Sequence, residues 1–280
     1  MRNHRGFSLI ELLVVLMIMT IVTGGIYKLL NSTQRISRAQ TERIDLQSNV
    51  RSASIVVPNE LREINNVVGG TASQIDIIAK SDTSIQYRAM RGMGFVCTGT
   101  TSTQLRLSNW TGYRAAQSTD QVYVFNDGAK TSIGSDDSWD TRQLTGNPVA
   151  GNTCAVGIPA TTLPIADLGR VPNIGDPVRT FEVMVLSLYE NGGQRWLGMQ
   201  SVSTGGALQP LLGPLAPTNG IRFTYLDANG AVTAVNANIR SIVVSVNGVS
   251  SLKVSKGGNA NNQYLAEAIT TQVALRNALR

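Results

Sequence analysis

Several residue types and motifs that carry enzyme chemistry are scarce or missing in this sequence. It has one histidine, His4, and two cysteines, with no Cys-x-x-Cys pair and no Cys/His cluster of the kind that holds zinc. It has no Walker loop, and no Gly-x-Gly-x-x-Gly motif follows a strand-like run, so the sequence predicts no nucleotide or dinucleotide site. We therefore expect neither a catalytic residue nor an organic cofactor, and we interpret the chain as a non-enzyme.

Long runs of one charge are also missing, although the formal net charge is +6. The Lys and Arg residues are scattered, and none of them form a run that could follow a phosphate backbone, so we expect no nucleic-acid partner. Hydrophobic residues make up 42% of the chain and charged residues 15%, which is typical of a folded protein. Helix formers become sparse after residue 70, which favours short strands joined by turns.

The longest apolar run begins at Phe7 and ends at Tyr27, and Glu11 is its one charged residue. A run of this length is what an α-helix needs to cross the hydrocarbon layer of a membrane. Because Arg2 and Arg5 precede it, we expect the N-terminus on the cytoplasmic side. An ordinary secretory signal has a shorter apolar core, and a plain signal anchor does not explain a carboxylate near the start of a membrane segment.

The segment RGFSLIELLVVLMIMTIV resembles the prepilin-peptidase motif of type IV pilins and type II secretion pseudopilins. Gly6, Phe7 and Glu11 match the leader glycine, the following phenylalanine and the glutamate of that motif. The resemblance implies that prepilin peptidase cleaves between Gly6 and Phe7 and that the new Phe7 amine is N-methylated. It also implies that Glu11 pairs with the cationic N-terminus of a neighbouring subunit and sets the axial register. Cleavage would remove His4, and with it the possibility of a Ser-His-Asp triad.

Beyond the membrane run, a second apolar pattern predicts that the helix continues. Its members step by three or four residues, which places them on one face of an α-helix. Pro58 falls inside the pattern, so we expect a kink or a new helix start near it. The members of this stripe are Leu46, Val50, Ala53, Val57, Leu61 and Ile64.

From about Thr71 the apolar period changes to two, which predicts strands. Loops at 190–193 and 227–230 are expected to close hairpins, and the Gly- and Pro-rich segment 127–177 is expected to be a loop insertion. The expected strands cover residues 74–78, 84–88, 104–107, 121–125, 181–189, 194–202, 221–225, 239–247 and 271–275.

These patterns predict an α+β, pilin-like fold in which a long N-terminal helix packs on an antiparallel sheet. We expect a leader at 1–6, a transmembrane and assembly helix at 7–27, the periplasmic half of the long helix at 28–66, and a β-rich domain at 67–280. Because export would place that domain in an oxidising compartment, Cys97 and Cys154 are interpreted as one disulfide. Two buried free thiols are the alternative.

Asp136, Asp137 and Asp140 lie close together in the loop-like segment and are a candidate calcium site, because Ca²⁺ prefers clustered oxygen ligands. Their spacing is not that of an EF-hand loop, and a solvated acidic loop is the alternative.

Residues 220–227 (GIRFTYLD) and 271–277 (TQVALRN) resemble large minor pilins and the J type of minor pseudopilin. The resemblance implies a minor pilin that primes or caps a type IV pilus, held by one span in the inner membrane with its C-terminal domain in the periplasm, then moved into an extracytoplasmic filament. Its expected partners are prepilin peptidase, other major and minor pilins or pseudopilins, and inner-membrane lipid. Two alternatives stay open: a minor pseudopilin of a type II secretion system, and a membrane-tethered adhesin or binding protein that does not polymerise.

Overall fold

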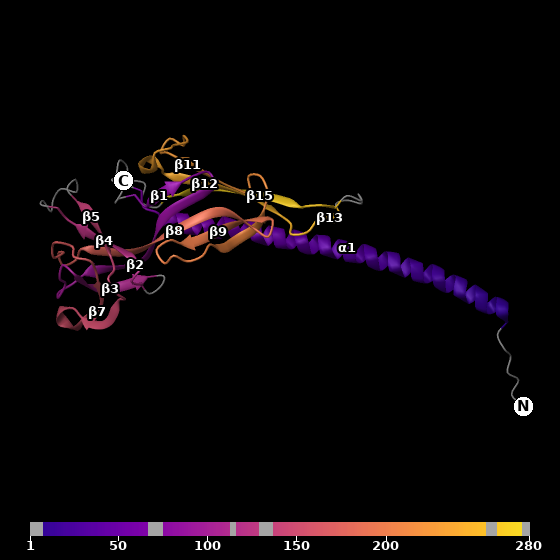
Figure 1. Ribbon diagram of the computed structural model, residues 1–280, viewed down its shortest axis with the longest axis horizontal. Helices are drawn as coiled ribbons and strands as arrows, with labels where there is room; N and C mark the ends of the chain where they lie inside the picture. The colour runs from indigo at the N-terminus through magenta and orange to yellow at the C-terminus, as the bar shows by residue number, and fades with distance from the viewer. Residues whose placement is uncertain (1–7, 67–74, 113–115, 129–136, 256–261, 276–280) are drawn as a thin grey trace, which may run out of the picture. The chain divides into compact units, whose positions relative to one another are not determined.

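The computed structural model describes residues 8–66, 75–112, 116–128, 137–255 and 262–275. In this part of the chain one long helix precedes a large antiparallel sheet, which confirms the expected α+β, pilin-like fold class (Figure 1). The elements are α1 (Leu9–Arg62), β1 (Ile77–Lys80), β2 (Ser84–Val96), β3 (Gln104–Gly112), β4 (Gln121–Asn126), β5 (Ser138–Gln143), β6 (Val149–Thr153), η1 (Ala155–Gly157), β7 (Pro159–Pro164), β8 (Pro177–Asn191), β9 (Gln194–Ser201), β10 (Gln209–Leu215), β11 (Ile221–Leu226), η2 (Asn236–Asn238), β12 (Ser241–Val249), β13 (Val254–Ser255), β14 (Asn262–Gln263) and β15 (Ala266–Ala274).

The chain divides into two compact units, and α1 contributes residues to both. The first unit comprises Met1–Ser48 together with Val249–Ala266, and the second comprises Asn49–Gly248 together with Glu267–Arg280. The second unit therefore holds nearly all of the sheet.

The apolar stripe predicted on α1 is buried along its whole length. Leu46, Val50, Ala53, Val57, Leu61 and Ile64 are each at most 3% exposed. In the second unit, the last four of these side chains belong to one core cluster with apolar side chains of the sheet. This shared core fixes the second half of α1 on the sheet.

Helix α1 continues through Pro58 and ends at Arg62, so of the two alternatives expected at this proline the new helix start is wrong, and the kink stays a prediction. A proline inside a helix removes one backbone donor and normally destabilises the helix. Val57 precedes Pro58 and Leu61 follows it, and both are fully buried. We infer that packing of these side chains offsets the missing hydrogen bond, since tertiary contacts provide most helix stability in proteins.

Among the described residues, thirteen strands form the main sheet. Its path runs β11–β12–β10–β9–β8–β2–β3–β7–β6, while β1 pairs with β2, β15 with β12, and β4 with both β8 and β5. The hairpin predicted at 190–193 is confirmed, because β8 and β9 pair across Gly192 and Gly193. Both glycines have positive φ angles, +62° and +74°, as a two-residue turn of the I′ type requires.

One other expectation about loops is wrong. Strands β5, β6 and β7 lie within 127–177, where the sequence predicts a loop insertion. The turn at 227–230 does close antiparallel pairing, although only as an isolated bridge between Leu226 and Val232, and the chain then passes through η2 before β12 pairs with β11. A second core cluster, formed mainly by side chains of β3, β4, β7 and the segments that flank them, packs one end of the sheet.

The first unit joins the start of α1 to the segment 249–266, which contains the β13–β14 pair. The N–H of Leu252 donates to Oε2 of Glu42 on α1, at 3.1 Å. Two hydrogen bonds of 2.9 Å join the ends of the segment. The N–H of Ser250 donates to the carbonyl of Leu265, and the N–H of Leu265 donates to the hydroxyl of Ser250. This segment therefore contacts α1 about one turn before its buried stripe begins.

Candidate functional site

The first part of α1 is apolar on all sides. One helix in the described part of the chain, α1, is long and apolar enough to span a membrane, and its most apolar 18-residue window has a mean hydropathy of 2.4. None of this window is buried inside the protein. The large apolar side chains from Leu9 to Val22 are 49% to 86% exposed. A surface of this kind needs lipid or another apolar surface to cover it.

Glu11 lies in the first turn of this helix. Its backbone N–H donates to the carbonyl oxygen of Ser8 at 3.1 Å and contacts the hydroxyl of Ser8 at 3.3 Å. Ser8 is therefore the N-cap, and Glu11 stands three residues later, as in a capping box. The spacing Ser-x-x-Glu could have identified this cap from sequence, and we did not predict it. The carboxylate of Glu11 is exposed, and the macrodipole favours a negative charge at this position.

Gly6 and Phe7, the expected cleavage and N-methylation positions, lie outside the described residues. The structure therefore describes the helix only from the residue after the expected methylated position.

Threonine hydroxyls inside the apolar run are satisfied by the helix itself. Thr20 donates to the carbonyl of Met17 at 2.8 Å, and Thr23 donates to the carbonyl of Met19 at 2.7 Å. These bonds remove two unpaired donors from a segment that has no water to bind. Gly24 and Gly25 do not end the helix. Apart from its chain neighbours and the surrounding helix backbone, a Cβ atom added at either position would meet no other atom within 4 Å.

The segment that follows α1 is fastened to the η2 region by a buried polar group. Asn66 is fully buried, and its side-chain amide donates to the carbonyls of Asn236 at 2.6 Å and Ile239 at 2.7 Å. The backbone N–H of Asn65 donates to a carboxylate oxygen of Asp76 at 2.8 Å. These partners are up to 173 residues apart in sequence, so no local pattern marks them.

Burial raises the pKa of Asp76 to about 6, against the ordinary 3.8. The hydrogen bond from the backbone N–H of Asn65 lowers this pKa, and so do the positive charges of Arg179 and Arg88. Burial outweighs them because the ionised form loses its hydration inside the protein.

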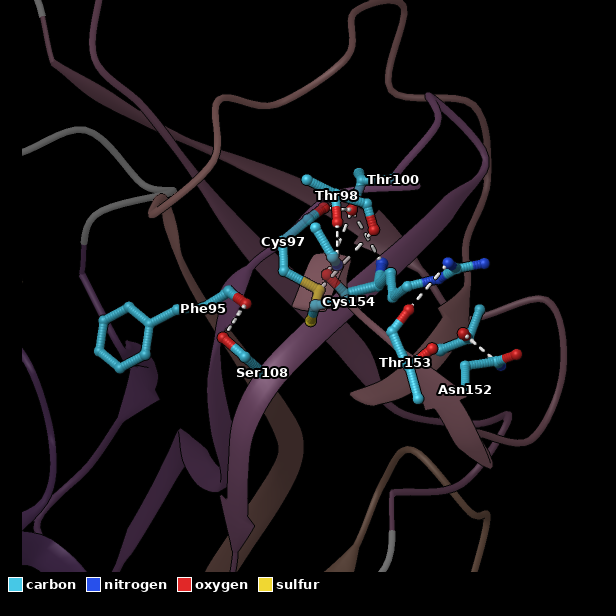
Figure 2. Close-up of a disulfide and its surroundings, with 11 residues drawn as sticks. Phe95, Cys97, Thr98, Thr100, Ser108, Asn152, Thr153 and Cys154 are labelled. Atoms are coloured by element: carbon cyan, nitrogen blue, oxygen red, sulfur yellow. Dashed lines mark hydrogen bonds between the residues drawn. A yellow bond between two sulfur atoms is a disulfide. The ribbon is translucent and has the colours of Figure 1, made fainter. Parts of the chain in front are cut away.

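A disulfide joins Cys97, which directly follows β2, to Cys154, which directly follows β6 (Figure 2). The two cysteines are 57 positions apart, and each side chain is 7% exposed. Next to the bond, the guanidinium of Arg106 donates to the carbonyl of Thr153 at 3.1 Å. A cross-link over a loop of this length stabilises a fold by roughly 2–5 kcal/mol.

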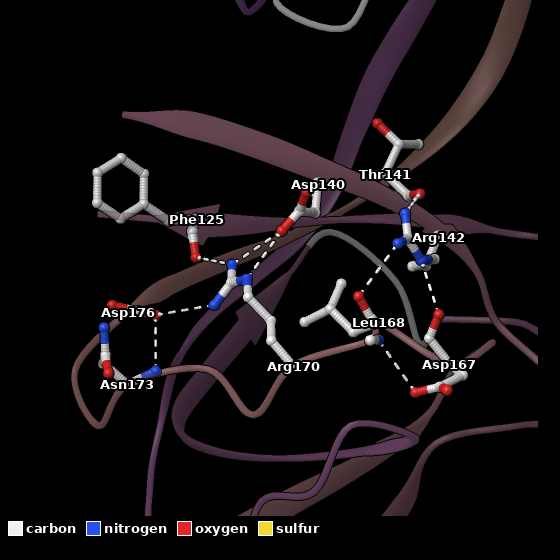
Figure 3. Close-up of polar contacts among 10 residues, drawn as sticks. Phe125, Asp140, Thr141, Arg142, Asp167, Leu168, Arg170, Asn173 and Asp176 are labelled. Atoms are coloured by element: carbon white, nitrogen blue, oxygen red, sulfur yellow. Dashed lines mark hydrogen bonds and ion pairs between the residues drawn. The ribbon is translucent and has the colours of Figure 1, made fainter. Parts of the chain in front are cut away.

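The candidate calcium residues do not gather into a described metal site. Asp136 lies outside the described residues, and Asp140 lies in strand β5, where it pairs with Arg170 at 2.9 Å (Figure 3). The same guanidinium reaches Asp176 at 3.9 Å. In the described ranges no group of three or more acidic, His or Cys side chains could hold a metal ion. The Asp140 carboxylate is thus engaged by an arginine, while Asp137 lies just before β5.

Comparison with known proteins gives one match. Residues 1–27 match the family model of the prokaryotic N-terminal methylation motif. No curated protein and no solved structure matches the chain. Together with the apolar helix, the motif supports a single-pass, membrane-anchored protein.

Proposed function

We propose that this chain is a minor pilin, a subunit that primes or caps the assembly of a type IV pilus. The N-terminal methylation motif supports a type IV pilin-like or pseudopilin protein, and thus a structural subunit rather than an enzyme. The observation that carries the proposal is the motif at the head of a helix whose first part, from Leu9 to Val22, exposes its large apolar side chains. Lipid covers this surface before assembly, and the helices of other subunits cover it in a filament.

Processing comes first in the proposed sequence of events. Prepilin peptidase cleaves after Gly6 on the cytoplasmic side, where the absence of a side chain lets the backbone approach the catalytic groups closely. The new amine of Phe7 is then methylated. The globular part stays on the opposite side of the membrane, in the periplasm.

Glu11 then sets the register of the subunit against its neighbours. Its carboxylate is exposed in the first turn of α1, within the apolar surface. A neighbouring subunit's cationic Phe7 amine would pair with it there. Coulomb attraction is several-fold stronger in apolar surroundings than in water, and an unpaired charge in such surroundings is costly. One axial position is therefore favoured over the others.

The chain length supports a minor subunit, because abundant pilins are usually much smaller. A minor pseudopilin of a type II secretion system carries the same N-terminal motif and is the second candidate. Neighbouring genes separate the two: a major pilin with a retraction motor favours the pilus, and a secretin with secreted hydrolases favours the secretion system.

The processing step is tested by the intact mass and N-terminal sequence of the protein from its native membrane. The expected chain begins at methylated Phe7. A chain that still begins at Met1, or that is cut after residue 22, would contradict the proposal.

The assembly step is tested by Glu11→Val, with Glu11→Asp as the charge-preserving control. The valine variant should insert and be cleaved normally, yet its amount in sheared filaments should fall at least ten-fold, because the register contact is lost. The aspartate variant should retain part of the incorporation. Wild-type levels of Glu11→Val in filaments would rule out the register role.

A further inference from the structure

The stretch of α1 that follows the apolar run is strongly basic. From Lys28 to Arg43 it carries four cations and a single carboxylate, Glu42. Glu42 accepts the N–H of Leu252. The four cations are Lys28, Arg35, Arg38 and Arg43; all are exposed, and no hydrogen bond or ion pair to another described residue holds their side chains. The chain itself, as far as it is described, does not neutralise them.

Three of the cations lie on one side of the helix. At 3.6 residues per turn, Lys28 and Arg35 are about 20° apart around the axis, and Arg38 is about 60° beyond Arg35. Exposed apolar side chains lie on the other side, roughly 150° away: Leu29, Ile36 and Ile44 are 68%, 56% and 65% exposed. These three cations therefore share one face, while the apolar side chains lie on the remaining circumference, where Arg43 stands about 20° from Ile36.

The position along the axis decides which cations can meet a membrane. Tyr27 ends the apolar run, and tyrosine is enriched at the membrane–water interface. At 1.5 Å per residue, Arg35 and Arg38 lie about 12 Å and 17 Å beyond Tyr27, and Arg43 lies about 24 Å beyond it. The headgroup layer of one leaflet is roughly 5–8 Å thick, and electrostatic attraction persists for about another 8 Å in physiological salt. Lys28 therefore falls among the headgroups, Arg35 falls within reach of them, Arg38 lies at the limit of that reach, and Arg43 lies well outside it.

We propose that Lys28, Arg35 and Arg38 form a binding surface for anionic phospholipid headgroups on the leaflet from which α1 emerges. This headgroup-binding face draws the cationic side of α1 onto the membrane surface. The opposite face, with Leu29 and Ile36, is left free for another helix. The inference rests on the membrane anchoring of the proposed function and not on filament assembly.

The test uses the full chain reconstituted in vesicles that contain spin-labelled phosphatidylglycerol or spin-labelled phosphatidylcholine. Electron paramagnetic resonance measures the fraction of each lipid immobilised at the protein. We expect the immobilised fraction of phosphatidylglycerol to exceed that of phosphatidylcholine several-fold. One cation near the surface raises the affinity for an anionic lipid by at most about five-fold. The triple variant Lys28→Gln, Arg35→Gln, Arg38→Gln should lose the preference. Raising the salt concentration should weaken it in the wild type, because salt screens exposed charges.

Arg43→Gln is the control, because it removes the same charge from the same helix at a greater distance from the membrane and on a different face. It should leave most of the preference, whereas Arg35→Gln should lower it clearly. The altered side chains are exposed, so the variants should keep the wild-type circular dichroism spectrum. A preference that survives the triple variant, or an equal effect of Arg43→Gln and Arg35→Gln, would overturn the proposal.

Competitors identify the source of the phosphate. Inorganic phosphate at matched ionic strength should displace no more lipid than chloride does. Stronger displacement by phosphate would indicate a free-anion site, and displacement by duplex DNA that depends on the same three cations would indicate a nucleic-acid surface; either result contradicts the lipid assignment. Filament assembly is absent from this assay. Lipid preference in a protein that never enters filaments would keep this inference and refute the proposed function.

Discussion

Asp76 shows how one buried carboxyl group can make stability depend on pH. Burial raises its pKa to about 6 in the folded protein, while in the unfolded chain the group titrates near 3.8. As the pH falls through 6, the folded state binds a proton that the unfolded state does not bind. The stabilising contribution is therefore complete below about pH 3.8 and is lost as the pH rises through 6.

The prediction at this scale compares the wild type with Asp76→Asn. The asparagine cannot titrate but can still accept the N–H of Asn65. Between pH 7 and pH 5, the free energy of unfolding of the wild type should rise relative to the variant by about 1 kcal/mol. Urea unfolding in detergent at the two pH values measures this difference. A wild-type-minus-variant difference that stays constant with pH would contradict the assigned pKa.

Single residues differed in how far the sequence could predict them. Glu11 was identified because it lies inside a contiguous motif. The N-cap role of Ser8 is equally local, since it follows from the contiguous spacing Ser-x-x-Glu, and it could have been predicted in the same way. Asn66 and Asp76 could not be found in this way, since their roles arise from partners brought together by the fold.

At the scale of elements, the buried stripe of α1 offers an internally controlled test. Leu61 is fully buried and Ile55, on the same helix, is 55% exposed. Leu61→Ala should lower the free energy of unfolding by about 2–5 kcal/mol, because it removes packed methyl groups and leaves a cavity. Ile55→Ala should change it by no more than about 0.5 kcal/mol. The same urea titration measures both variants, and equal losses would contradict the assigned packing.

The strands that the sequence did not reveal are those with unfavourable composition. β7 begins at Pro159 and ends at Pro164, β10 contains Pro210 and Pro214, and β5 carries two charges in six residues. Proline is normally confined to strand ends, edges and irregular ladders, so these segments read as loops. The ladder between β9 and β10 does shift register twice. Strands with regular alternation, such as β8 and β12, were identified, although their ends differ from the predicted ones.

At the scale of the whole molecule, the exposed apolar helix predicts how the chain behaves in cells. The full chain should stay in the membrane pellet after alkaline carbonate extraction. Met17 lies in the middle of the apolar run and is 64% exposed. Met17→Lys should shift chains into the soluble fraction, because a lysine at the centre of a membrane helix costs roughly 2.5–3.5 kcal/mol. Gln34→Lys, beyond the run, is the control and should extract like the wild type; equal extraction of both variants would contradict the assigned span.

The continuous path of α1 into the core of the second unit has a mechanical consequence. Ala53, Val57, Leu61 and Ile64 lie in one core cluster with the sheet, and Asn66 is tied to two distant carbonyls. We expect tension applied along the helix axis to load all of these contacts together. Contacts loaded in shear yield together, whereas contacts that are peeled yield one after another. We therefore expect the globular part to stay attached when this chain is pulled by its helix.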